Sequence, residues 1–193
     1  NFAAQKRAVT INDYVSQLRT MPSSFGSPAK ASATEIENKI KLSVLSYTPG
    51  GTLTSNVSST LKNNIATYLS NHRMINDYIM VGSAKVIDLR LEIDLIIANG
   101  VNQSEVVTSV ISIVGEYFKT DKIEMGQDLA LGELRKQIMN QDGVVNIVDV
   151  RVYNQVGDPY SQSVSTQPYI NATTKQIGLI DDTIFAQPDE ILQ

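Results

Sequence analysis

The chain has 193 residues, with 16 Lys and Arg against 20 Asp and Glu, and a formal net charge of −4. It contains no Cys and a single His, which excludes disulfides, thiolate metal sites, cysteine nucleophiles and His-rich metal centres. The positive charges are scattered and no apolar run approaches a membrane span, so we expect neither a nucleic-acid partner nor a membrane partner.

The first predicted element is a short amphipathic helix within RAVTINDYVSQL at residues 7–18. Thr10 offers a hydroxyl to the free N–H groups of a first helical turn, and Asp13 adds a carboxylate beside the positive helix end. One apolar stripe follows at helical spacing, formed by Ile11, Tyr14, Val15 and Leu18. Pro22 ends this helix. Because the sequence begins with Asn rather than Met, we expect a fragment or a processed form of a longer protein.

A strand and a helix are expected in the next part of the chain. Residues 23–36 are rich in small side chains and fit either an extended strand or a loop. Residues 39–47 alternate in hydrophobicity, which predicts a strand, and the TPGG motif at residues 48–51 predicts a turn. A helix is expected from about Ser55, with apolar positions at Val57, Leu61, Ile65, Tyr68 and Leu69.

The clearest strand pattern lies within residues 79–98, where polar and apolar side chains alternate. One face carries apolar side chains only, at Ile87, Leu89, Leu91, Ile93, Leu95 and Ile97. The other face carries charges, at Asp88, Arg90, Glu92 and Asp94. This pattern predicts a sheet with one buried face and one face in water.

Three further elements are expected after a turn at residues 99–103. The first is a helix capped by Asn102 and Glu105, and its wide apolar arc predicts extensive burial. The second is a helix with Leu131, Leu134 and Ile138 on one side, and the third is a strand over residues 144–156. This order of elements predicts an α+β fold, with a mixed sheet covered by helices on one face.

The composition changes at Gly157, so residues 1–156 are predicted to form the α+β region and residues 157–193 a C-terminal arm. Residues 157–176 are polar and poor in aliphatic side chains, which favours an irregular or β-rich arm or hairpin. Apolar residues return after them, and an exposed apolar arm packs on its own domain or on a neighbour. We expect an oligomer contact at Ile177, Leu179, Ile180, Ile184 and Phe185.

The row Asp88, Glu92 and Asp94 is the main candidate for an enzyme site. Alternate residues on a strand lie about 6.5–7 Å apart, a separation that suits paired acid chemistry. However, Arg90 lies between them, and the solvent face of any one-sided sheet shows the same pattern. A solvated or partner-contacting face is the preferred interpretation, and the alternative is a hydrolase that uses this acidic strand face.

Other polar features have simpler structural explanations. His72 stands at a predicted helix end, where a surface or capping role is favoured over general base catalysis. The pair Asp181 and Asp182 fits a turn better than a cation site, and the TPGGT motif lacks the Lys and the glycine spacing of a phosphate loop. A carbohydrate-binding module has little support, because the chain has no Trp. We therefore expect no catalytic residue, no metal and no cofactor.

The order of several segments resembles the baseplate J-like proteins, which are wedge subunits of contractile phage tails and related injection machines. RAVTINDY at residues 7–14 is similar to a helix entry of that family. The long strand is followed by NQSEVVTSVISIVGEYF, MGQDLALGELRKQI and GVVNIVDVRV, an order similar to that of the family's C-terminal half. The resemblance covers residues 7–152, and the wedge subunits of T-even-like phages are the nearest members.

The resemblance implies a late structural virion protein of the tail baseplate, assembled in the host cytoplasm, with no enzymatic activity and no cofactor. Such wedge subunits form dimers and join other wedge and hub proteins in a ring around the tail hub. The ring rearranges when the sheath contracts. The resemblance also implies that this chain is the C-terminal part of a larger subunit.

Overall fold

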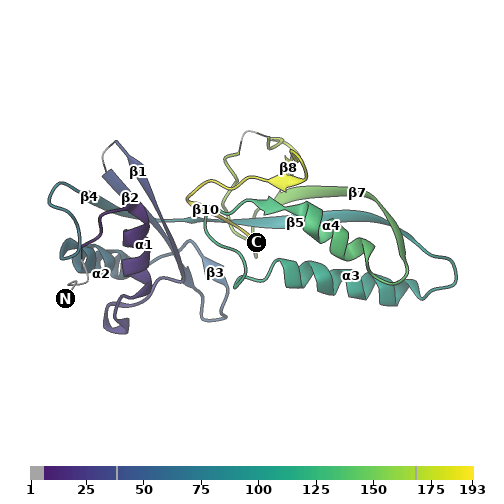
Figure 1. The fold of residues 1–193 in the computed structure, drawn as a ribbon, viewed down its shortest axis with the longest axis horizontal. Helices are drawn as coiled ribbons and strands as arrows, with labels where there is room; N and C mark the ends of the chain where they lie inside the picture. Colours follow the sequence, from purple (N-terminus) through teal and green to yellow (C-terminus); the bar gives the residue numbers. More distant parts are fainter. Residues whose placement is uncertain (1–6, 38, 168) are drawn as a thin grey trace, which may run out of the picture. The chain divides into compact units, whose positions relative to one another are not determined.

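The computed structural model describes residues 7–37, 39–167 and 169–193. The chain divides into two compact units (Figure 1). Unit 1 consists of Asn1–Val86 and Pro188–Glu190, and unit 2 consists of Ile87–Gln187 and Ile191–Gln193. Helices combine with sheets of mixed strand direction, so the predicted α+β class is confirmed. Within these described residues, the strands form two four-stranded sheets and one two-stranded sheet, rather than the single sheet that was expected.

The sheet of unit 1 is built around β2 (Lys39–Tyr47), the strand predicted from its alternating pattern. Its neighbours are β1 (Lys30–Ile36) and β3 (Leu53–Thr54), both antiparallel, and β4 (Tyr78–Ser83), which is parallel. β1 lies in the segment of small residues, which is therefore a strand, after a short 3-10 helix η1 (Ser23–Phe25). The strand pattern predicted across residues 79–98 is divided at Ala84, because β4 pairs with β2 while the next strand belongs to another sheet.

Two capped helices complete unit 1. In α1 (Ile11–Arg19), the Thr10 hydroxyl accepts from the Asp13 N–H at 3.3 Å, and the Asp13 carboxylate accepts from the Thr10 and Val9 N–H groups at 2.8 and 2.9 Å. These backbone hydrogen bonds hold the pKa of Asp13 below its usual value. α2 (Ser59–Ser70) begins later than the sequence predicted, because β3 and the Ser58 cap occupy the preceding residues.

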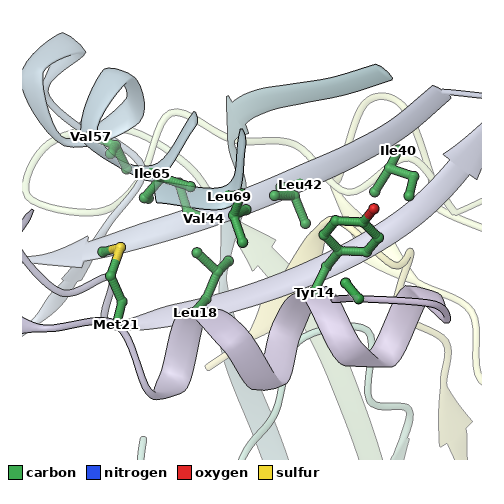
Figure 2. Packing of buried hydrophobic residues seen from close by; sticks show 10 residues of the cluster. Tyr14, Leu18, Met21, Ile40, Leu42, Val44, Val57, Ile65 and Leu69 are labelled. Atoms are coloured by element: carbon green, nitrogen blue, oxygen red, sulfur yellow. The ribbon is translucent and has the colours of Figure 1, made fainter. Parts of the chain in front are cut away.

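The core of unit 1 lies where the apolar stripes of α1 and α2 meet the sheet. Figure 2 shows the side chains of α1, including Leu18, gathered against Leu42 and Val44 of β2 and against Ile65 and Leu69 of α2. All five of these side chains are buried. Tyr14 is also buried, and its hydroxyl donates to the Asp77 carboxylate. Burial, with a contribution from Asp77, raises the pKa of Tyr14 to about 12.

Unit 2 contains a long antiparallel pair of strands, β5 (Lys85–Ile97) and β7 (Val144–Gln155), flanked by shorter strands. The order of the sheet is β10 (Glu190–Leu192), β5, β7 and β8 (Gln176–Ile177). α4 (Leu131–Met139) packs on β7, and α3 (Gln103–Tyr117) packs on α4, so both helices run alongside the strand pair (Figure 1). The short strands β6 (Leu129–Ala130) and β9 (Thr183–Ile184) pair with each other.

Residues 157–187 lie in unit 2, so the change of composition at Gly157 does not coincide with the boundary between units at Val86 and Ile87. Polar contacts hold the irregular segment to the strands. The Asn154 side chain accepts from the Ser165 N–H at 2.9 Å, and the Asp88 carboxylate accepts from the Ser161 N–H at 2.6 Å. The loss of regular structure after residue 156 is therefore not a loss of contact with the strands.

We expect Leu18→Ala to lower the free energy of unfolding by about 2–5 kcal/mol, because it removes a fully buried side chain and leaves a cavity. Ile75→Ala is the matched control, since Ile75 is 88% exposed, and it should change stability by less than about 0.5 kcal/mol. Urea unfolding followed by circular dichroism measures both variants. Equal midpoints for the two variants would contradict this assignment of the core.

The raised pKa of Tyr14 predicts a pH-dependent contribution to stability. The folded state favours the protonated phenol, so this contribution is fully present below pH 10 and is lost as the pH rises toward 12. The difference in Tm between the wild type and Tyr14→Phe should therefore shrink over this interval. Tyr160→Phe, at an exposed loop position, is the control and should show no such trend. A constant difference for Tyr14→Phe would argue against the phenol–carboxylate contact.

Candidate functional site

An apolar groove of about 260 Å³ lies within unit 2, between β5 and α3. The strand contributes three aliphatic side chains and the helix contributes four. They are Leu91, Ile93 and Leu95 from β5, and Val107, Val110, Ile111 and Val114 from α3. All seven described residues that line the groove are aliphatic, so its chemistry is that of an apolar contact surface.

The periodicities of the two elements create this groove. The helix residues recur at three- and four-residue steps and form one stripe, and the strand residues alternate along one face. Leu91 and Ile93 pair with Val152 and Val150 of β7, which are buried. Since α4 packs on β7 and α3 packs on α4, the helical layer leaves Val150 and Val152 of β7 buried, whereas the groove side chains of β5 are only half-buried.

The wide apolar arc of α3 predicts extensive burial of this helix, and this prediction is wrong. Only Val106 and Val110 of the helix are buried, whereas Val107 is 43% exposed and Ile111 is 65% exposed. The apolar arc of α3 is wider than the surface that α4 covers. The width of the apolar arc is visible in the sequence, whereas the extent of the surface that α4 offers to it is not.

The five residues predicted to form an oligomer contact are not equally accessible. Ile177 is 2% exposed and Ile184 is fully buried, because each is paired in a short strand of unit 2. The expectation that these two side chains are exposed is therefore corrected. Leu179 is half-buried, and Ile180 and Phe185 are each 37% exposed. A contact role stays a prediction, and the exposed part of this set is Ile180 and Phe185.

The acidic row of β5 is engaged in contacts within the chain. The Arg151 guanidinium lies 3.0 Å from Asp94 and 3.4 Å from Glu92, and 2.7 Å from Asp149 on its own strand. These partners, Asp94 first, raise the pKa of Arg151. Asp88 accepts from the Ser161 N–H and, at 2.9 Å, from the Gln193 side chain. The carboxylates are therefore placed as ion-pair and hydrogen-bond acceptors, and Asp149 is a member of this cluster that no pattern in the sequence indicates.

The other polar features also have structural partners. The Nδ1 atom of His72 lies 2.9 Å from the Tyr68 carbonyl oxygen, and its ring packs on the Tyr68 ring. Asp181 and Asp182 have φ angles of 50° and 54°, and the Thr183 N–H bonds to the Ile180 carbonyl at 2.9 Å. These values describe a tight turn of the kind that joins two strands, so the predicted turn is confirmed. The predicted TPGG turn is confirmed by a 2.9 Å bond from the Gly51 N–H to the Thr48 carbonyl.

A second hollow, of about 230 Å³, lies beside the end of α3 and has a mixed lining, which includes Glu116 and Lys122 as well as Ile123 and Leu129. The two charged groups of this lining pair with each other, because Glu116 lies 2.7 Å from Lys122, and Glu116 also contacts Lys119. These hydrogen bonds lower the pKa of Glu116 to about 2. Within the residues that the structure describes, no cluster of His, Cys, Asp and Glu is suited to a metal ion. No helix of the described part of the chain is long and apolar enough to cross a membrane.

Comparison with known proteins gives a structural match only. No protein family matches the sequence, and no curated protein matches it. The fold is similar to that of a chain in the six-fold symmetrised cryo-EM structure of the anti-feeding prophage (AFP) baseplate, with a TM-score of 0.60 and 11% sequence identity. The match covers 98% of this chain and 38% of that chain, so this chain spans less than half the length of the protein it matches.

We expect Arg151→Met to lower the Tm, because it leaves Glu92, Asp94 and Asp149 without their shared cation. The loss should be smaller in about 1 M NaCl than in about 0.05 M NaCl, since salt screens the repulsion among the carboxylates. Arg90→Met is the matched control, because Arg90 contacts Glu92 alone among these acids. Thermal unfolding of the variants at both salt concentrations measures the effect. Equal losses for the two variants would show that Arg151 does not organise the cluster.

Proposed function

We propose that this chain is a structural component of a contractile-tail baseplate and that it acts by binding neighbouring subunits. The observation that carries the proposal is the fold similarity to a chain of the AFP baseplate, which extends over 98% of this chain at a TM-score of 0.60. A match across nearly the whole chain includes both units, whereas a common supersecondary motif would match only a part.

The contacts within the chain support a role in binding rather than catalysis. The carboxylates of the acidic row are occupied by Arg151, a backbone N–H and an amide side chain, so a hydrolase based on that row has no free acid pair. The groove instead exposes aliphatic side chains to water. Covering such surface is favourable by about 25 cal/mol per Å² before the costs of association are subtracted.

The resemblance to the baseplate J-like family supports a narrower form of the proposal. The chain is the C-terminal part of a wedge subunit that dimerises, joins the ring around the tail hub and rearranges on sheath contraction. Its place is the virion or tail-like particle, after assembly in the host cytoplasm. Ile180 and Phe185, each 37% exposed, supply the part of the predicted oligomer contact that other subunits can reach.

The test is the location of the chain in assembled particles. Tail-like particles purified from the organism that encodes the chain should contain it in a fixed ratio to the other tail proteins, measured by mass spectrometry. Gold-labelled antibody raised against the chain should mark the baseplate end of the tail in electron micrographs, and antibody pre-absorbed with the purified chain is the control. Particles that assemble and contract without the chain would refute the proposal.

A further inference from the structure

Asn99 and Gly100 form the tip of the turn that joins β5 to α3. Both residues are exposed, and Asn99 is the only Asn of the sequence that is followed by Gly. Gly100 has a φ angle of +84°, and a Cβ built at this position would meet no atom of the described residues within 4 Å. The tip of the turn is therefore open to water, and no neighbouring side chain hinders a change in its backbone.

The hydrogen bonds of this turn hold its two ends and leave its tip free. At one end, the Ala98 N–H donates to the Gly143 carbonyl at 2.9 Å. At the other end, the Asn102 side chain caps α3. Within the residues that the structure describes, neither the Gly100 N–H nor the Asn99 side chain has a hydrogen-bond partner. The side-chain amide and the following backbone nitrogen are therefore neighbours without a competing bond.

An Asn side chain that precedes Gly can react with the main chain. The Gly nitrogen attacks the Asn Cγ atom, so a new C–N bond forms, and the bond from Cγ to Nδ2 breaks with release of ammonia, which carries away the proton of the Gly nitrogen. Water then opens the succinimide ring at either of its carbonyl groups. The products are Asp and isoaspartate, and in isoaspartate the main chain is longer by one methylene group. Gly favours ring closure because it has no Cβ to crowd the ring.

We propose that Asn99 is a modification site, at which the folded chain converts to Asp and isoaspartate through attack by the Gly100 nitrogen. Water is the only co-reactant. Other Asn residues of unit 2 are held differently, since the Asn102 side chain is engaged in the cap of α3, and Asn146 and Asn154 lie within β7. The proposal rests on the chemistry of this turn and holds whether or not the chain belongs to a baseplate.

The isoaspartate product alters the connection that holds the start of α3. The turn is fixed by the Ala98 hydrogen bond at one end and by the Asn102 cap at the other, so a longer main chain must displace one of these ends. α3 supplies the helical wall of the groove, which includes Val107 and Ile111. The Asp product adds only a negative charge before the positive end of the helix, which does not disturb it. The two products therefore differ in their expected effect on the anchoring of α3.

Ageing of the purified chain in buffer measures the reaction. Trypsin cleaves after Arg90 and Lys119, so a single peptide contains both Asn99 and Asn102. Mass spectrometry of that peptide, with electron-transfer fragmentation, distinguishes Asn, Asp and isoaspartate at each position. Asn99 should convert at least about tenfold faster than Asn102, because the residue that follows it lacks a Cβ. The rate should rise with pH, because the backbone nitrogen attacks after it has lost its proton.

The same chain unfolded in urea is the reference for the effect of the fold. If the folded turn leaves the site open, Asn99 should convert in the folded chain at a rate within about tenfold of that in urea. Asn99→Gln is the matched control, because it keeps a side-chain amide but would have to form a larger ring, and it should not convert. Conversion in urea without conversion in the folded chain would overturn the proposal, because the folded turn would then protect Asn99. Equal rates at Asn99 and Asn102 in the folded chain would overturn it as well.

Hydrogen exchange of the Ala98 amide, followed by NMR, tests the consequence for α3. Asn99→Asp is the control, because it carries the charge of the modified chain without the longer main chain. The isoaspartate form, separated from the aged chain by ion exchange, should exchange the Ala98 N–H at least about tenfold faster than Asn99→Asp. Exchange that is equally slow in both would overturn this part of the proposal, since the longer turn would then leave the bond to Gly143 intact.

Discussion

The incomplete covering of the apolar face of β5 is the constraint on which the organisation of unit 2 depends. A sheet with a continuous aliphatic face needs a second layer, and two helices supply it here. α4 packs on β7 and α3 packs on α4, so the layer is anchored over one strand of the pair. The aliphatic side chains of the other strand remain half-buried beside a helix that exposes its own apolar stripe. Within this chain, the helical layer therefore leaves part of the apolar face of β5 uncovered.

On the opposite face of the sheet, charged side chains of the two strands compensate one another. Asp94 and Asp149 are directly paired across β5 and β7, a position in which two acids repel each other. Arg151 contacts both and also reaches Glu92, to which Arg90 is paired as well, so Arg151 is the cation that the three carboxylates share. The charges of that face are compensated within the chain, whereas aliphatic side chains of the groove are still exposed to water. The asymmetry between the two faces indicates which side of the strand pair is available for a contact with another protein.

The sequence predicts those elements whose signal is local. The cap formed by Thr10 and Asp13 depends on residues four positions apart or fewer, and the turn at Asp181 and Asp182 depends on its own backbone. The division at Ala84 was missed because it is decided by pairing with β2, far earlier in the chain. The pairing of Asp94 with Asp149 depends on the register of β5 and β7, which shifts after Asp94 and again after Ile96. The exposure of Ile111 depends on where α4 packs, and the periodicity of α3 contains no information about that position.

An exposed apolar groove is also a hazard, because such surface associates with unrelated chains. The molecule limits this hazard through the alternation of β5, in which the charged side chains Arg90, Glu92 and Asp94 stand between the groove residues and on the opposite face. Charged side chains on a strand oppose its pairing with unrelated strands. The alternation that supplies the apolar wall of the groove therefore also limits nonspecific association.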